Sequence, residues 1–255
     1  MMLFRQYLEE HRFLAVGYFF LLLINILAGT YYWPELRDNF PEVIKLIPLE
    51  SLQEFVRAFE TNGYWAYFSV QQFFKGAGMF GIAAGGLIGS GLVAREVDRR
   101  TAELLLSRPV SRARILFTRW LAGAFLLFVP YVGVALIGWA IAPQVEENLD
   151  MMLVLRGSCY TFLFILCAYT ATVALSTRFS NQLKAGILVL GLLLMQLAIY
   201  MIDKLWDYSL YNLIDLDVTL PMDGGPFPWM EAGWLSAFTL LFYGLALWGF
   251  RSRDF

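Results

Sequence analysis

The chain has 255 residues, of which 59% are hydrophobic and only 16% are charged. This composition lies outside the usual range of soluble globular domains and indicates an integral membrane protein. The formal net charge of −2 argues against a nucleic-acid-binding surface, which would need a clear excess of Lys and Arg.

Six long apolar runs without a charged residue follow one another along the chain. About 20 apolar residues in a helix suffice to cross a hydrocarbon core of about 30 Å. We therefore predict an all-α, polytopic membrane protein that forms a single domain over residues 1–255. The six expected transmembrane helices lie at about 13–34, 76–94, 120–142, 157–177, 185–202 and 232–250, with a cytoplasmic loop at 95–119 and outer segments at 35–75, 143–156 and 203–231.

Alternate loops differ in charge. One set of loops comprises both termini, the loop 95–119 and residues 177–184. It holds 13 Lys and Arg residues and 6 acidic residues, whereas the other set holds 6 Lys and Arg residues and 15 acidic residues. Lys and Arg concentrate in short cytoplasmic loops. Both termini are therefore expected in the cytoplasm, with the protein in a bacterial or archaeal inner membrane.

The N-terminal residues predict an amphipathic helix at the membrane surface, because Leu3, Phe4, Tyr7 and Leu8 share one helical face. A cleaved signal peptide is disfavoured, since acidic residues interrupt its basic region and the apolar run that follows is long. The outer segment 35–75 contains a second amphipathic stretch. It predicts a helix that either covers the translocation mouth or only tethers the chain to the outer leaflet.

The loop 95–119 reads REVDRRTAELLLSRPVSRARILFTR and holds seven of the 19 Lys and Arg residues. Residues 101–107 are expected to form a short amphipathic helix, in which three consecutive leucines make an apolar surface that needs a partner. Pro109 would end this helix, and the hydroxyl of Ser111 would cap the next one.

This loop resembles the E…GT-x-E-L-L-L-S-x-P-V-S-R signature of ABC-2 type permeases, the membrane subunits of ATP-binding-cassette transporters. The likeness includes the permeases of nitrous-oxide reductase maturation systems. The matching residues are Glu96, then 101–107, then 109–112, whereas Arg100 stands where the family usually has Gly. The resemblance implies that the segment is a coupling helix, which docks into a cleft of the ATPase subunit.

The resemblance and the three consecutive leucines together predict that this loop is a docking surface for an ATPase subunit. For Arg112, Arg114 and Arg119, the positive-inside bias alone gives a simpler explanation, namely a solvated basic linker. The candidate docking residues are Glu96, Arg99, Thr101, Glu103, Leu104, Leu105, Pro109, Ser111 and Arg112.

The second expected helix carries a small residue at every fourth position: Ala77, Gly81, Gly85 and Gly89. Such a ridge lets two membrane helices approach closely. Packing within the subunit is the favoured interpretation. A contact with a second permease is the alternative, in line with the dimers that the family forms.

No Asp, Glu, Lys, Arg or His falls within the six runs, which disfavours a proton-coupled transporter and an intramembrane enzyme. Neither a catalytic nor a metal-binding residue is predicted. The acidic segment 203–231, with its tryptophans and tyrosines, is interpreted as an outer face with interfacial anchors; a cation site there is disfavoured because the spacing fits no EF-hand. The candidate substrate path comprises Asn25, Lys75, Gln196 and Tyr200.

For these path residues a structural role is also open. Asn25 and Gln196 are expected to bond between helices, whereas Lys75 and Arg156 are expected to reach toward lipid phosphates, or to hold a cargo with an anionic headgroup.

The sequence lacks a GxxxxGK[ST] loop, so it cannot bind nucleotide phosphates in that way. We expect a non-catalytic subunit that binds no cofactor, while ATP and Mg bind a partner ATPase. By resemblance, the complete transporter has two ATPase copies and a second permease, as a homodimer or heterodimer. An amphipathic or lipid-like cargo fits the apolar interior.

The alternative from another class is a membrane scaffold or mechanical transmitter, which recruits an ATPase to act on an extracytoplasmic protein without passing cargo. A membrane enzyme comes third.

Overall fold

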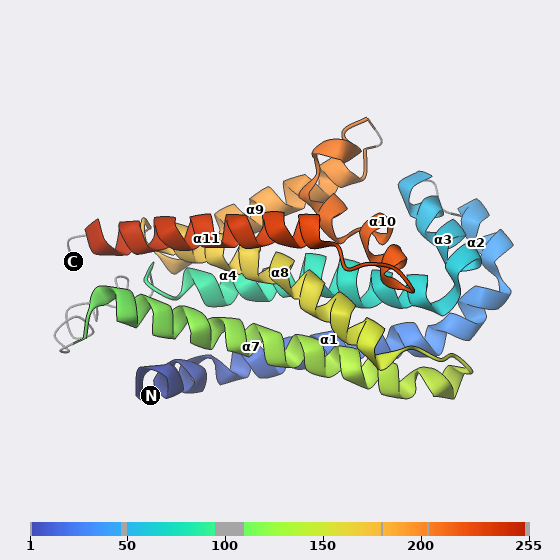
Figure 1. The fold of residues 1–255 in the computed structure, drawn as a ribbon, viewed down its shortest axis with the longest axis horizontal. Helices are drawn as coiled ribbons and strands as arrows, with labels where there is room; N and C mark the ends of the chain where they lie inside the picture. The colour runs from blue at the N-terminus through green and yellow to red at the C-terminus, as the bar shows by residue number, and fades with distance from the viewer. Residues whose placement is uncertain (1, 47–49, 95–109, 180, 203, 253–255) are drawn as a thin grey trace.

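The computed structural model describes residues 2–46, 50–94, 110–179, 181–202 and 204–252. These residues form helices and connecting loops with no strand, so the all-α prediction is confirmed for them (Figure 1). In chain order the elements are α1 (Met2–Asp38), α2 (Phe40–Leu46), α3 (Glu50–Phe68), η1 (Ser69–Gly81), α4 (Ile82–Ser90), α7 (Arg112–Ile141), η2 (Ala142–Val145), α8 (Met151–Ser176), α9 (Gln182–Tyr200), η3 (Trp206–Tyr208), η4 (Leu210–Ile214), α10 (Leu216–Thr219), η5 (Leu220–Met222) and α11 (Trp229–Ser252).

Five helices among the described residues are long and apolar enough to cross a membrane. The expected second span, 76–94, is not one of these five. It falls on η1 and α4, which continue directly from α3. The five candidate spans are Phe4–Asp38, Arg112–Val145, Met151–Ser176, Gln182–Tyr200 and Trp229–Ser252.

Several helices begin before the apolar runs because polar side chains cap them. The Asp150 carboxylate accepts hydrogen bonds from the backbone N–H groups of Met152 and Leu153, at 2.6 and 3.1 Å. The Asn181 side chain accepts in the same way at the start of α9. Each cap satisfies backbone donors that the first helical turn would leave open.

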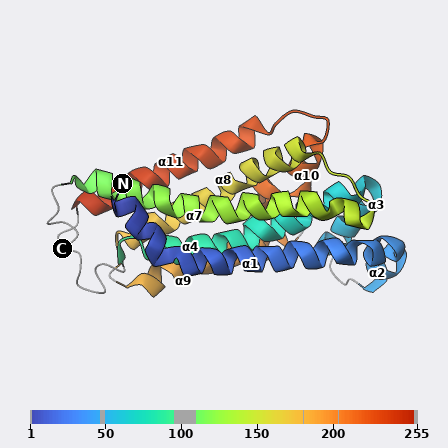
Figure 2. The ribbon, with the colours of Figure 1, turned by 90° about the horizontal axis from the view of Figure 1, so that it is seen from below.

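The N-terminal residues are helical, as expected, but they are continuous with the first span in the single helix α1. Figure 2 shows that its first turns lie at an angle to the rest. Tyr7 on the apolar face is buried, and Phe4 and Leu8 pack against the core. The apolar face of this segment therefore contacts the protein's own helices.

The long helices lie side by side in a bundle, in which α1 packs along α7 and α8 packs along α11 (Figures 1 and 2). Helix α4 contacts both α8 and α9. The short elements between α9 and α11 gather at the end of the bundle that also holds α2 and α3, opposite the start of α7 (Figure 1).

Helix η1 is a π-helix of 13 residues. Long π-helices are rare, because most are single turns inside α-helices. Three side chains from other elements donate hydrogen bonds to its backbone carbonyls. These bonds run from Asn25 to Gln71 at 3.0 Å, from Tyr131 to Gln72 at 3.2 Å and from Tyr211 to Gly78 at 2.6 Å. They stabilise an unusual backbone in the middle of the bundle.

Candidate functional site

The predicted docking residues from Glu96 to Pro109 lie outside the described residues. The elements that lead into and out of this stretch are described: α4 with residues 91–94 on one side, and α7 on the other. These elements show how the rest of the protein holds the two ends of the loop.

Ser111 caps α7, as the sequence predicts. Its backbone is extended, and its hydroxyl accepts a hydrogen bond from the backbone N–H of Arg114 at 3.4 Å. The chain therefore turns from the loop into α7 at a defined residue. A role for Ser111 in docking stays a prediction.

Arg112 joins the start of α7 to the end of α11. Its guanidinium donates to the carbonyl oxygens of Phe250 and Arg251 at 3.3 and 3.1 Å. The last carbonyls of a helix have no partner within the helix and carry partial negative charge, which favours a cation there. A displacement of the loop would therefore act on α11 as well as on α7.

The interpretation of Arg119 as part of a solvated linker is wrong. Its side chain is only 4% exposed. The guanidinium donates to the carbonyl oxygen of Leu92 at 3.1 Å and lies 5.9 Å from the centre of the Tyr7 ring. Burial is tolerated because the charge meets carbonyl dipoles just beyond the end of α4.

The first turns of α1 complete this arrangement. The Tyr7 hydroxyl donates to the carbonyl oxygen of Ile88 at 3.1 Å, and the Tyr7 ring stacks on buried His11 with centroids 4.2 Å apart. We call Tyr7, His11 and Arg119 the loop-anchoring cluster, which joins α1 and α7 to α4 and to Leu92 just after it. Arg112 makes a separate contact, which joins α7 to α11.

The small-residue ridge of η1 and α4 faces α8 of the same chain. A Cβ atom added at Gly81 would lie 2.5 Å from Ile165, and one at Gly89 would lie 2.9 Å from the carbonyl oxygen of Tyr169. Backbones this close have no room for a larger side chain.

The candidate path residues fall into two pairs. Asn25 and Lys75 both contact Gln71: the Asn25 amide donates to its backbone carbonyl, and the Lys75 ammonium donates to its side-chain oxygen at 3.1 Å. Gln196 lies toward the C-terminal end of α9, where its side chain accepts from the Leu210 backbone N–H at 3.0 Å. Tyr200 ends the same helix.

Sequence reasoning missed Gln71 and Gln72, because residues 35–75 were assigned to an outer segment. Both side chains are buried, and the Gln72 amide donates to the carbonyl oxygen of Tyr131 at 3.0 Å. A signal was present in the sequence, since no charged residue occurs between Glu60 and Lys75. That run extends the second apolar stretch toward the N-terminus.

Asp215 does not belong to an exposed acidic face, so that interpretation is wrong for this residue. Its side chain is 6% exposed. It accepts hydrogen bonds from the Tyr200 hydroxyl at 2.8 Å and from the Leu216 N–H at 2.7 Å. Burial raises the pKa of Asp215 to about 6, although both hydrogen bonds act to lower it.

Arg156 lies in the N-terminal part of α8, where its guanidinium donates to the carbonyl oxygen of Gly225 at 3.1 Å. In the structure it therefore holds a loop of the same chain.

Comparison with protein families gives one match. Residues 4–209 match the model described as "ABC-2 family transporter protein". The match covers most of the chain, from the first turns of α1 to the segment after α9. No curated protein and no solved structure matches the chain.

Proposed function

Because the chain belongs to the ABC-2 transporter family, whose members are multi-pass membrane subunits, we propose that it is the permease of an ABC transporter powered by a separate ATPase. The observation that carries this proposal is the family match over residues 4–209. The docking surface would be the loop segment 96–112, which carries the family signature.

In this proposal the permease has six transmembrane helices, and the second is formed by η1 and α4. Both termini and the loop lie in the cytoplasm. The distribution of Lys and Arg supports this orientation. So does the position of the first turns of α1, the start of α7 and the end of α11 at one end of the bundle (Figure 1).

The proposed mechanism is alternating access. ATP and Mg bind the ATPase pair, whose closure displaces the loop segment. Arg112 and the loop-anchoring cluster would then transmit this displacement, because Arg112 bonds to the end of α11 and Arg119 bonds to Leu92, just beyond the end of α4. Two permeases, as a homodimer or a heterodimer, would rearrange around a path for an amphipathic or lipid-like cargo.

A second candidate function is a mechanical transmitter that acts on an extracytoplasmic partner without passing cargo. Hydrogen bonds that candidate path residues make within the chain favour this function. Asn25 and Gln196 both bond to backbone groups of the same chain, which leaves these polar atoms engaged in structural contacts. An ATPase turnover that responds to an extracytoplasmic protein, instead of to a cargo, would favour this candidate.

The test is a double substitution in the loop. Glu103→Arg with Leu105→Asp should abolish co-purification of the ABC ATPase while leaving the protein in the membrane, because the apolar surface would gain a buried charge. The measurement is affinity purification of the full chain from its native membrane, with the ATPase identified by mass spectrometry through its nucleotide-binding motifs.

The matched control carries the same two changes on the opposite side of the membrane. Glu60→Arg with Leu205→Asp alters exposed positions of the outer segments. This variant should retain the ATPase at the wild-type level. An ATPase yield that is unchanged by the loop substitutions would refute docking at this segment.

A further inference from the structure

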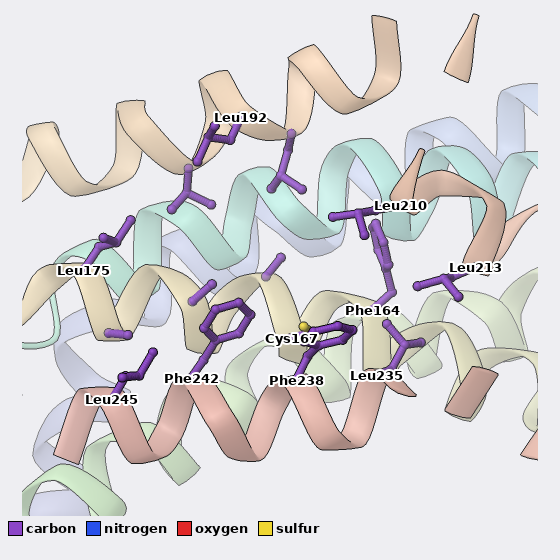
Figure 3. A pocket seen from close by; sticks show the side chains of 15 residues that line it. Phe164, Cys167, Leu175, Leu192, Leu210, Leu213, Leu235, Phe238, Phe242 and Leu245 are labelled. Carbon is purple, nitrogen blue, oxygen red and sulfur yellow. The ribbon is translucent and has the colours of Figure 1, made fainter. Parts of the chain in front are cut away.

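An apolar groove of about 430 Å³ lies between α9 and α11, with α8 as its floor (Figure 3). Its lining includes Leu192 of α9, Phe238 and Phe242 of α11, and Cys167 of α8. The volume lies within the range of small-molecule binding sites. Because α8, α9 and α11 are candidate membrane spans, the groove would open into the hydrocarbon layer.

An apolar space between two membrane spans is filled either by a helix or by an acyl chain. Leu210 and Leu213 of η4 line one end of the groove, and Leu175 and Leu245 line the other end (Figure 3). A transmembrane helix of a second copy must cross the full bilayer and would meet η4. An acyl chain can terminate inside the groove.

The end of the groove that Leu175 and Leu245 line has cationic side chains nearby. Arg178 and Trp248 follow Leu175 and Leu245 by three residues, which is close to one helical turn. The exposed guanidinium of Arg178 lies 4.3 Å from the centre of the Trp248 ring. Lys184, which is also exposed, lies in the first turn of α9. A cation beside an exposed indole at the end of an apolar groove matches a lipid phosphate above its acyl chain.

We propose that this groove binds a phospholipid of the cytoplasmic leaflet, with one acyl chain between α9 and α11 and the phosphate at Arg178. The leaflet follows from the orientation proposed above. The site goes beyond the transport role, because the lipid is a resident ligand that stays bound during turnover.

The probe is phosphatidylglycerol with a photoreactive diazirine in its acyl chain, added to the purified full chain in phosphatidylcholine nanodiscs. Crosslinks should map to peptides that contain Leu192, Phe238 or Cys167. Ala171→Phe places a ring in the groove and should lower this crosslinking about tenfold, since displacing about two methylene groups has that effect on affinity. Ala198→Phe, the same change on the exposed face of α9, should leave it unchanged.

A second pair keeps the test valid if Ala171→Phe fails to fold. Leu192→Trp fills the groove from its exposed rim, and Leu194→Trp makes the same change outside it. Arg178→Gln should lower crosslinking of phosphatidylglycerol several-fold more than crosslinking of a phosphatidylcholine probe with the same acyl chain, because the lost cation acts on the anionic headgroup.

Three results would overturn the proposal. Crosslinking that is unaffected by both groove-filling substitutions would mean general lipid contact. Crosslinks from Leu192→Cys to a second copy would identify a subunit interface. Loss of the bound lipid during ATP turnover would identify cargo. The crosslinking measurements need no ATPase, so their failure is distinct from a failure of ATPase docking; only the turnover measurement uses the complete transporter.

Discussion

The carboxyl group of Asp215 is buried and hydrogen-bonded, so its contribution to the stability of the fold depends on pH. Burial raises its pKa from 3.8 to about 6. The folded state therefore holds the proton more strongly than the unfolded state does, and its contribution to stability is complete below about pH 4. That contribution is lost as the pH rises through about 6. The rise in pKa corresponds to about 3 kcal/mol.

Asp215→Asn should remove this pH dependence. The amide oxygen of Asn can still accept from the Tyr200 hydroxyl and the Leu216 N–H, while the buried negative charge is gone. In detergent, the melting temperature of the variant relative to wild type should rise between pH 4 and pH 7. The exposed Asp207→Asn should show no such trend, and equal melting curves for Asp215→Asn and wild type at all pH values would contradict the assignment.

Single residues also show what a sequence can and cannot predict. The Ser111 cap was predictable, because it depends on residues within one turn of helix. The burial of Arg119 and Asp215 was not, because it depends on partners distant in sequence: Leu92 and Tyr7 for the first, and Tyr200 for the second. From their charge alone, both Arg119 and Asp215 were expected to be exposed.

The contact between α4 and α8 depends on the small residues of the ridge. Gly89→Ala would place a Cβ atom 2.9 Å from a backbone carbonyl of α8, which cannot move as a flexible side chain can. We expect it to destabilise the folded protein by about 1–3 kcal/mol, seen as a lower melting temperature and a higher rate of proteolysis.

Gly133→Ala in α7 is the matched control, because no atom lies within 4 Å of its added Cβ. Ala has the higher helix propensity, by about 1 kcal/mol, so this variant should be as stable as wild type or more stable. If Gly89→Ala behaved like Gly133→Ala, the two helices would be farther apart than the structure has them.

The positions of the long helices follow largely from apolar runs, but η1 does not. The charge of Lys75 suggested that the second membrane helix begins at residue 76, so Gln71 and Gln72 were assigned to the outer segment. In the structure the helical stretch continues through them, because Asn25, Tyr131 and Gln71 itself provide hydrogen-bond partners. A π-helix that depends on donors from other helices cannot be predicted from its own residues.

The orientation of the whole molecule can be tested by labelling. In a Cys159→Ala, Cys167→Ala background, Glu60→Cys should react with a membrane-impermeant maleimide in intact cells. Ser252→Cys should react only after the membrane is opened. Both positions are exposed and lie at opposite ends of the bundle. Labelling of Ser252→Cys in intact cells would place the loop 95–119 outside and refute the proposed coupling.

At this scale the sequence predicted the family correctly. Most of the family signature lies outside the described residues, apart from residues 110–112. The family match, in contrast, covers residues 4–209 and so most of the chain. The mutual arrangement of helices was not predictable, because apolar runs specify length and not neighbours.

The candidate spans differ greatly in length. At 1.5 Å per residue, the 19 residues of α9 reach about 28 Å and the 30 residues of α7 reach about 45 Å. The first value is close to the thickness of the hydrocarbon layer, whereas the second exceeds it and requires tilt or projection beyond the headgroups. The first eight residues of α7 hold Arg112, Arg114 and Arg119, so projection of this basic end beyond the hydrocarbon layer accounts for about 12 Å of the difference. The remaining 22 residues reach about 33 Å, so a bilayer of one thickness can surround both helices.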